Sequence, residues 1–220
     1  MQLLERIEKR RFIGREFVLW LWFESELFDA TLSTKAHGDF GLWIEKEILL
    51  SNGKETTRIK GGSPAQAREA KEALLLGKLP ERATFHLTLG EREATFALKA
   101  EPLALAGLKL PTVREGEGDA PAPGELGAAK PSRPKLRRTS VEEDAEAEAD
   151  ARNESFYERM VLTREVEVLI ESLYRDFLKL RLGAGWETVL LPVLRAWVAG
   201  QEPDAEEYRA ARGKVLKGRR

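Results

Sequence analysis

The sequence contains no cysteine and only two histidines, His37 and His86. The absence of cysteine excludes disulfide bonds, thiolate nucleophiles and thiolate metal sites. The two histidines lie on separate segments without a carboxylate at a metal-ligand spacing, so we expect no metal site and no cofactor. No residue pattern indicates a catalytic group, and we expect a protein that is not an enzyme.

Long apolar runs are also absent. The apolar run Phe17–Phe23 has seven residues, whereas a helix that spans a bilayer needs about 20. The N-terminus carries acidic residues and no long apolar stretch, so it does not resemble a signal peptide. With 42% hydrophobic residues, the chain has enough apolar side chains for a core. We therefore expect a soluble cytoplasmic protein with no membrane partner.

The chain as a whole has almost no net charge, but single segments of it are strongly acidic or basic. The chain has 36 Lys and Arg against 37 Asp and Glu, which gives a net charge of −1. Residues 139–151, by contrast, carry six acidic residues and no basic one. Basic residues concentrate before this acidic block and at the end of the chain, namely Lys130, Arg133, Lys135, Arg137 and Arg138, then Lys214, Lys217, Arg219 and Arg220. The neutral sum therefore hides basic and acidic blocks.

Residues 12–28 form the segment around which the chain is organised. They include two of the five tryptophans and four of the nine phenylalanines. A helix that is apolar on all sides must be buried on all sides. We predict that this segment is the central helix of the core, with a buried strand as the alternative, since periodicity does not separate the two for a short run. We interpret its flanking carboxylates, Glu16, Glu24 and Glu26, as solvated helix ends.

The segments after residue 28 predict an α+β domain over residues 1–111. Residues 29–39 are polar and turn-like, and two later pairs of alternating strands are each joined by a tight turn. Between the pairs, Ser63 and Pro64 are typical of a helix start and Gly77 of a helix end. We expect a buried aromatic helix packed on an antiparallel sheet of two hairpins with one helix. The predicted strands are 40–51 and 54–60, joined by a type I′ turn at Asn52-Gly53, then 82–89 and 93–100, joined by Gly90-Glu91.

Residues 112–220 predict a linker, two helices and a tail. Residues 112–152 are rich in Pro, Gly, Ala and charge and indicate a flexible charged linker, whose acidic end has the composition to join the next helix. Apolar residues at spacings of three and four predict one long amphipathic helix over 154–182, with a break near Thr163 as the alternative. A second helix over 186–198 is interrupted or offset at Pro192. We expect residues 153–200 to form a helical hairpin that packs on the core or on a partner, and 201–220 to be an exposed basic tail.

The basic clusters are the strongest candidates for a binding site. Lys9, Arg10, Arg11 and Arg15 precede the aromatic helix and would form one patch with Lys46, Arg58 or Lys60 of the first hairpin. Such a patch would bind phosphates without sequence preference and with strong salt dependence. The alternative interpretation is an ordinary solvated face.

The string of residues 12–26, FIGREFVLWLWFESE, resembles a segment of the recombination-associated RdgC family of bacteria. Later pieces are similar in the same order, among them residues 60–64, 69–74, 108–111 and 177–181. The similarity covers roughly residues 12–111 and 154–198. It implies a non-enzymatic DNA-binding protein that is dimeric, ring-like in its best-known members, binds duplex DNA with little sequence preference and restrains RecA-dependent strand exchange.

We therefore expect a nucleoid-associated homodimer that binds DNA at low specificity and competes with RecA for it. The alternative is a non-enzymatic interaction or scaffold protein that uses its C-terminal helices. A contiguous positive face would favour DNA binding, whereas an exposed apolar helix face without a positive groove would favour the scaffold. The candidate DNA-binding residues are Lys9, Arg10, Arg11, Arg15, Arg58, Lys60, Lys130, Arg133, Lys135, Arg137, Arg138, Lys214, Lys217, Arg219 and Arg220.

Overall fold

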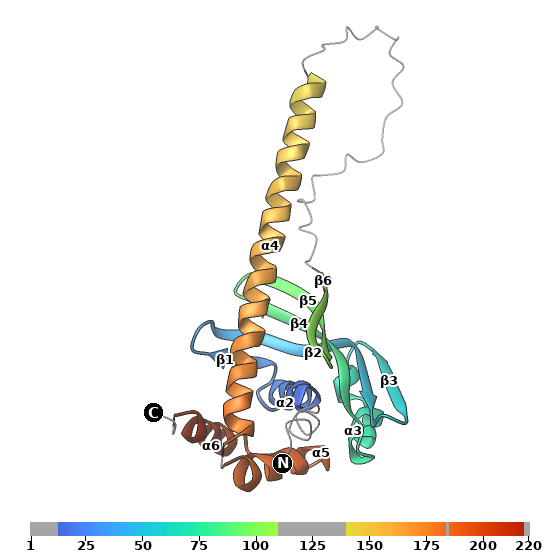
Figure 1. The fold of residues 1–220 in the computed structure, drawn as a ribbon, viewed down its shortest axis with the longest axis vertical. Coiled ribbons are helices and arrows are strands. Elements are labelled where there is room, and N and C mark those ends of the chain that lie inside the picture. The colour runs from blue at the N-terminus through green and yellow to red at the C-terminus, as the bar shows by residue number, and fades with distance from the viewer. Residues whose placement is uncertain (1–12, 110–139, 184, 218–220) are drawn as a thin grey trace, which may run out of the picture. The chain divides into compact units, whose positions relative to one another are not determined.

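The computed structural model of the protein describes residues 13–109, 140–183 and 185–217 (Figure 1). The chain divides into two compact units, of which the first comprises residues 1–110 and 165–220 and the second residues 111–164. The long helix α4, Ser140–Arg181, begins in the second unit and ends in the first. No helix among the described residues is long and apolar enough to cross a membrane.

The first unit contains a six-stranded antiparallel sheet, which confirms the predicted α+β class. The strand order is β1-β2-β4-β5-β6, and β1 and β3 pair with the two ends of the same edge of β2. The two predicted hairpins are present as β2–β3 and β4–β5, but β1 and β6 were not predicted. The strands are β1 (Thr31–Thr34), β2 (Gly38–Ser51), β3 (Thr56–Gly61), β4 (Leu79–Leu89), β5 (Arg92–Ala100) and β6 (Leu103–Lys109).

A bulge in β2 explains the one charged residue on its apolar face. The pairing of β2 with β4 shifts register between Ile44 and Ile48, and Lys46 between them has a φ of 69°. The extra residues let Ile44 and Ile48 both stay buried while the Lys46 side chain remains in solvent. Bulges insert residues in this way without disturbing the alternation on either side.

The turns differ in detail from those predicted. The first hairpin has a four-residue loop, 52–55, and not a two-residue type I′ turn, because the Asn52 side-chain oxygen accepts hydrogen bonds from the backbone amides of Lys54 and Glu55 at 3.0 and 2.9 Å. Ser63 makes no side-chain cap, and a 3₁₀ turn, η1 (Pro64–Gln66), precedes helix α3 (Arg68–Leu75). Gly77 ends that helix in the left-handed conformation, with φ 78°, as predicted.

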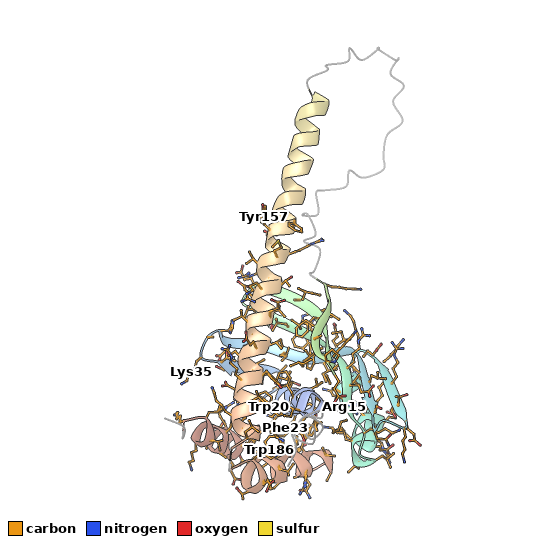
Figure 2. The ribbon with its side chains drawn as sticks, in the orientation of Figure 1. Arg15, Trp20, Phe23, Lys35, Tyr157 and Trp186 are labelled. Atoms are coloured by element: carbon orange, nitrogen blue, oxygen red, sulfur yellow. The ribbon has the colours of Figure 1, made fainter. Side chains whose placement is uncertain are left out.

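The aromatic segment forms helix α2, Ile13–Leu27, and is buried from Phe17 to Ser25, which confirms the prediction of a central helix. One side of α2 packs on strands β2, β4 and β5. The other side packs on the end of α4 and on two further helices, α5 (Leu191–Val198) and α6 (Ala205–Lys217) (Figures 1 and 2). Ring centroids lie 5.5 Å apart for Phe17 and Phe177 and 5.0 Å apart for Phe23 and Tyr208. The helix is therefore the middle layer of three.

The C-terminal half is more helical than the sequence indicates. Helix α4 runs unbroken from Ser140, so residues 140–152 of the predicted linker are helical, while residues 112–139 lie outside the described residues. One π-helical turn, η2 (Trp186–Leu190), precedes α5, which agrees with an interruption near Pro192. The predicted exposed tail is wrong for α6, because Tyr208 on this helix is buried against α2.

Candidate anion-binding cleft

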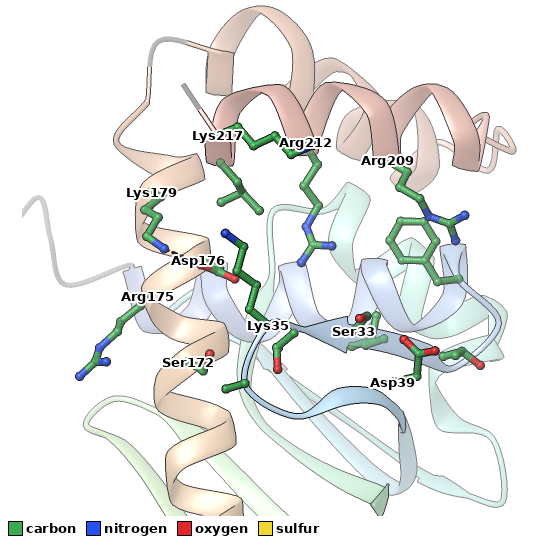
Figure 3. Close-up of a pocket in the computed structure, with 17 residues that line it drawn as sticks. Ser33, Lys35, Asp39, Ser172, Arg175, Asp176, Lys179, Arg209, Arg212 and Lys217 are labelled. Atoms are coloured by element: carbon green, nitrogen blue, oxygen red, sulfur yellow. Dashed lines mark hydrogen bonds and ion pairs between the residues drawn. The ribbon is translucent and has the colours of Figure 1, made fainter. Parts of the chain in front are cut away.

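A cleft of about 790 Å³ opens between the turn that joins β1 to β2, the last turns of α4 and helix α6 (Figure 3). Its wall carries six basic side chains and two acidic ones. Three of the basic side chains pair with glutamates beyond the wall, Arg175 with Glu171, Arg209 with Glu206 and Arg212 with Glu24. The basic residues are Lys35, Arg175, Lys179, Arg209, Arg212 and Lys217, and the acidic residues are Asp39 and Asp176. Three elements far apart in the sequence thus converge on one concentration of positive charge.

Helical spacing places the basic side chains on the walls of the cleft. Arg175 and Lys179 are four residues apart on α4, which puts them on one face of that helix. Arg209 and Arg212 are three residues apart on α6, which puts them on neighbouring positions of one face, and Lys217 lies five residues further on. The Asp204 side chain fixes the start of α6 by accepting hydrogen bonds from the backbone amides of the second and third residues of that helix, both at 2.9 Å.

Most of the cleft cations have partners that a ligand could replace. Lys179 pairs with Asp176 at 2.8 Å, and Arg209 pairs with Glu206 at 2.7 Å and covers the Phe28 ring. Exposed ion pairs of this kind contribute between zero and about 1 kcal/mol to the stability of the fold. Within the described part of the chain, Lys35 and Lys217 are exposed and have no ion-pair partner. In Figure 3, Lys35 points from its turn into the space between α4 and α6. The cleft therefore offers cations that an anion could bind without breaking a strong interaction.

A buried polar network lies behind Arg212. Glu24 of α2 is 0% exposed, and its Oε1 lies 3.0 Å from Arg212 Nε. The Tyr208 hydroxyl donates to the same oxygen at 2.9 Å and accepts from Trp20 Nε1 at 3.1 Å. Burial raises the pKa of Glu24 to about 7, although the charge of Arg212 and the hydrogen bond from Tyr208 act in the opposite direction. Burial also raises the pKa of Tyr208 well above its ordinary value.

A second polar cluster joins α2 to α3 and α5. The Glu26 carboxylate accepts hydrogen bonds from the indole nitrogens of Trp22 and Trp197 and from Lys71 Nζ. Lys71 Nζ also lies 3.0 Å from the centroid of the Trp197 ring. Burial lowers the pKa of Lys71, although Glu26 partly offsets this. Two of the three partners, Trp22 and Trp197, are buried core side chains, so we assign the cluster a structural role.

The interpretation of the α2 carboxylates as solvated helix ends is wrong for Glu24 and incomplete for the other two. Glu24 is fully buried. Glu16 pairs with Arg181 of α4 at 2.6 Å, and Glu26 holds the cluster with Lys71. The reason is that the C-terminal helices cover the side of α2 that the sheet leaves open.

Among the sequence-predicted basic residues that the structure describes, Lys217 alone lies on the wall of this cleft. Arg15 is 13% exposed and pairs with Glu81 and Glu101. Arg58 pairs with Glu47 across the β2–β3 hairpin, and Lys60 and Lys214 are exposed on β3 and α6. The structure therefore does not gather Arg15, Arg58 and Lys60 into an unpaired patch. Lys9, Arg10, Arg11, Lys130, Arg133, Lys135, Arg137, Arg138, Arg219 and Arg220 lie outside the described residues.

Sequence reasoning missed five of the six cleft cations. Arg209 and Arg212 carry a usable signal, because a spacing of three places both on one face of a helix. Arg175 and Lys179 carry the same signal at a spacing of four. Lys35 carries none, since its position in the cleft depends on how the β1–β2 turn sits against α4 and α6.

A separate feature of the described part of the second unit is an apolar face on α4. Phe156, Tyr157, Met160 and Val161 are 53% to 66% exposed. The rings of Phe156 and Tyr157 pack edge to face, with centroids 6.1 Å apart. Clustered exposed aromatic and Met side chains are typical of a surface that contacts another protein. Both features that separate the two functional hypotheses, a positive cleft and an exposed apolar helix face, are therefore present.

Comparison with known proteins finds no match: no family model, no curated protein and no solved structure is similar to this chain.

Proposed function

We propose that the protein binds nucleic acid in the cleft through the phosphate backbone, with little sequence preference. The observation that carries this proposal is the convergence of six basic and only two acidic side chains from three separate elements. A polyanion that enters the cleft is attracted by its basic side chains, and its bound counterions are released as lysines and arginines replace them. Salt should therefore weaken binding steeply.

The types of side chain suit phosphate oxygens. An arginine guanidinium can donate two parallel hydrogen bonds to one phosphate, and lysine supplies a mobile point charge. Ser33 of β1 and Ser172 of α4 also line the cleft, and their hydroxyl groups can donate to phosphate oxygens. Contacts of this kind fix the position of a backbone and do not read bases.

The resemblance of residues 12–26 to the RdgC family supports the same proposal and extends it. On that basis the ligand is duplex DNA, the protein is a nucleoid-associated homodimer in the cytoplasm, and it restrains RecA by competing for DNA. The basic residues outside the described ranges, such as Arg137 and Arg138, would add further phosphate contacts.

The test is a fluorescence-anisotropy titration with a random duplex and the matching single strand at several salt concentrations. We expect saturable binding whose logarithm falls linearly with the logarithm of salt concentration. The double variant Lys35→Glu/Lys217→Glu should weaken binding on the order of tenfold or more and flatten the salt dependence, because at least two phosphate contacts are lost.

The matched control is Lys54→Glu/Lys109→Glu, which makes the same change in net charge at two exposed positions away from the cleft. It should bind nearly as the unmodified protein does. Equal losses in the two double variants would mean that net charge matters and the cleft does not. No binding at low salt would refute the proposal.

The apolar face of α4 favours a second candidate function, protein–protein interaction. Two copies that pair through Phe156 and Met160 would bury side chains that are more than half exposed in one chain. Sedimentation equilibrium of the unmodified protein and of Phe156→Ser/Met160→Ser tests this. A dimer that the double substitution converts to a monomer supports it, and an unchanged mass in the variant excludes this face as the contact between copies.

A further inference from the structure

We propose that nucleic-acid binding in the cleft takes up a proton at Glu24, the buried carboxyl that holds Arg212 from behind. The inference rests on the proposed function of the cleft and adds its regulation by pH. Glu24 itself does not line the cleft, so it acts through Arg212 and is a positioning residue.

Arg212 connects the cleft with the interior. Its side chain is 14% exposed and forms part of the cleft wall, while its Nε lies 3.0 Å from Glu24 Oε1. In Figure 3 it points from α6 toward α2, the helix that carries Glu24. A phosphate in the cleft and the Glu24 carboxylate would therefore be two anions on either side of one guanidinium group.

The buried carboxyl is incompletely satisfied as an anion. Oε1 lies next to both Arg212 and the Tyr208 hydroxyl, whereas Oε2 is buried and accepts no hydrogen bond from any described residue. A buried ionised carboxylate is unfavourable unless its oxygens are paired and hydrogen-bonded. A proton on Oε2 would remove the charge without disturbing the contact of Oε1 with Tyr208.

The other charged and titratable groups around Glu24 determine the direction of the effect. Arg212 and Tyr208 approach from α6 and stabilise the anion, whereas Asp176 on α4 destabilises it. Lys35, on the β1–β2 turn, faces the same cleft from the opposite wall. Because burial raises the pKa of Glu24 to about 7, the group is partly protonated near neutral pH and responds to a nearby charge.

A bound phosphate adds a second negative charge beside Arg212 and therefore favours the protonated form of Glu24. By thermodynamic reciprocity, protonation of Glu24 strengthens phosphate binding by the same factor. Protonation also leaves the charge of Arg212 uncompensated and available to the ligand. Affinity should therefore rise as the pH falls through the pKa of Glu24.

The experiment measures the affinity for a short dye-labelled oligonucleotide from about pH 6 to about pH 8 at constant ionic strength. A phosphodiester backbone does not change its charge in this range, so the ligand adds no titration of its own. If a bound phosphate strengthens proton binding at Glu24 about tenfold, affinity falls on the order of fivefold between these pH values. The variant Glu24→Gln should bind with no such dependence, and at about pH 8 it should bind as tightly as the unmodified protein does at about pH 6.

Two further variants make the result specific. His37→Gln should keep the pH profile of the unmodified protein, and it is the control because histidine is the usual source of a pH dependence in this range. Tyr208→Phe removes the hydrogen bond that stabilises the Glu24 anion, so it should move the midpoint of the profile to higher pH. Circular dichroism checks that each variant is folded, and Tyr208→Phe decides the question if Glu24→Gln does not fold.

The outcomes separate this inference from the proposed function. If folded Glu24→Gln retains the pH profile, or if Tyr208→Phe leaves the midpoint unchanged, the coupling through Glu24 is refuted while DNA binding stands. If His37→Gln abolishes the profile, the histidine and not Glu24 is responsible. If the oligonucleotide does not bind at any pH, the proposed function is refuted and this inference with it.

Discussion

Replacement of Glu24 by glutamine should stabilise the folded protein at high pH and have almost no effect at low pH. The pKa of this carboxyl is about 7 in the folded protein, against an ordinary value of 4.5. The difference of about 2.5, at 1.36 kcal/mol for each pKa unit, amounts to about 3 kcal/mol. Glu24 is 0% exposed, so solvent screening does not reduce this figure.

The sign follows from the direction of the shift. The unfolded chain releases the proton of Glu24 more readily than the folded chain does, because burial raises the pKa in the folded state. The contribution of the protonated group to stability is therefore fully present below pH 4.5 and is lost as the pH rises through about 7. Glutamine keeps the shape of the protonated group and cannot ionise, so the variant escapes this loss.

The assay is urea denaturation followed by tryptophan fluorescence, at a series of pH values from about 4 to about 8.5 and without nucleic acid. The quantity of interest is the free energy of unfolding of Glu24→Gln minus that of the unmodified protein, because the titration of other groups cancels in this difference. It should be near zero at the lowest pH and reach about 3 kcal/mol at the highest. The control Glu69→Gln, at an exposed position on α3, should give a flat difference.

A flat difference for Glu24→Gln as well would refute the reasoning, because it would mean that the carboxyl has the same proton affinity in the folded and unfolded chains. A difference that becomes negative at high pH would mean that the ion pair with Arg212 outweighs the cost of burial.

Three further substitutions test the packing of the first unit by the same denaturation assay. Gly14→Ala should lower the free energy of unfolding by roughly 1–3 kcal/mol, since a Cβ at this position would lie 2.0 Å from the Ala100 carbonyl oxygen. Gly213→Ala should have the opposite effect. Gly213 lies in the interior of α6 and a Cβ there would meet nothing within 4 Å, so the free energy of unfolding should rise by up to about 1 kcal/mol. Phe177→Ala should cost about 3–5 kcal/mol, since the ring is fully buried against α2, and a smaller loss would contradict the three-layer arrangement.

Local patterns in the sequence were sufficient for much of the fold. Alternation of apolar residues predicted strands β2, β4 and β5, and the run Phe17–Phe23 predicted the buried helix α2. These predictions succeed because period and composition are properties of short segments. Strand β1 was missed because Leu32 is the one large apolar residue in its four positions, and its pairing with β2 is what defines it.

The tail was predicted to be exposed for a similar reason. Helix α6 carries six charged residues among its thirteen, and Tyr208 is its one buried aromatic residue, beside the pair of Arg212 with Glu24. A lone tyrosine among charged residues gives no periodic signal. Helical spacing could have paired Arg209 with Arg212, but the sequence does not indicate that α6, which carries three of the six cations, docks beside α4 and the β1–β2 turn.

The burial of α2 on all sides has a consequence that reaches beyond the helix itself. If a helix is covered on every face, the polar residues at the end of its apolar run are covered too, and they need partners inside the protein. Ser25 finds one within its own helix, where its hydroxyl donates to the Trp22 carbonyl at 2.7 Å. Glu24 finds one in Tyr208, 184 residues further along the chain. The same apolar run that made the central helix predictable thus required a buried acid, and the helix that satisfies this acid also carries Arg212 into the cleft.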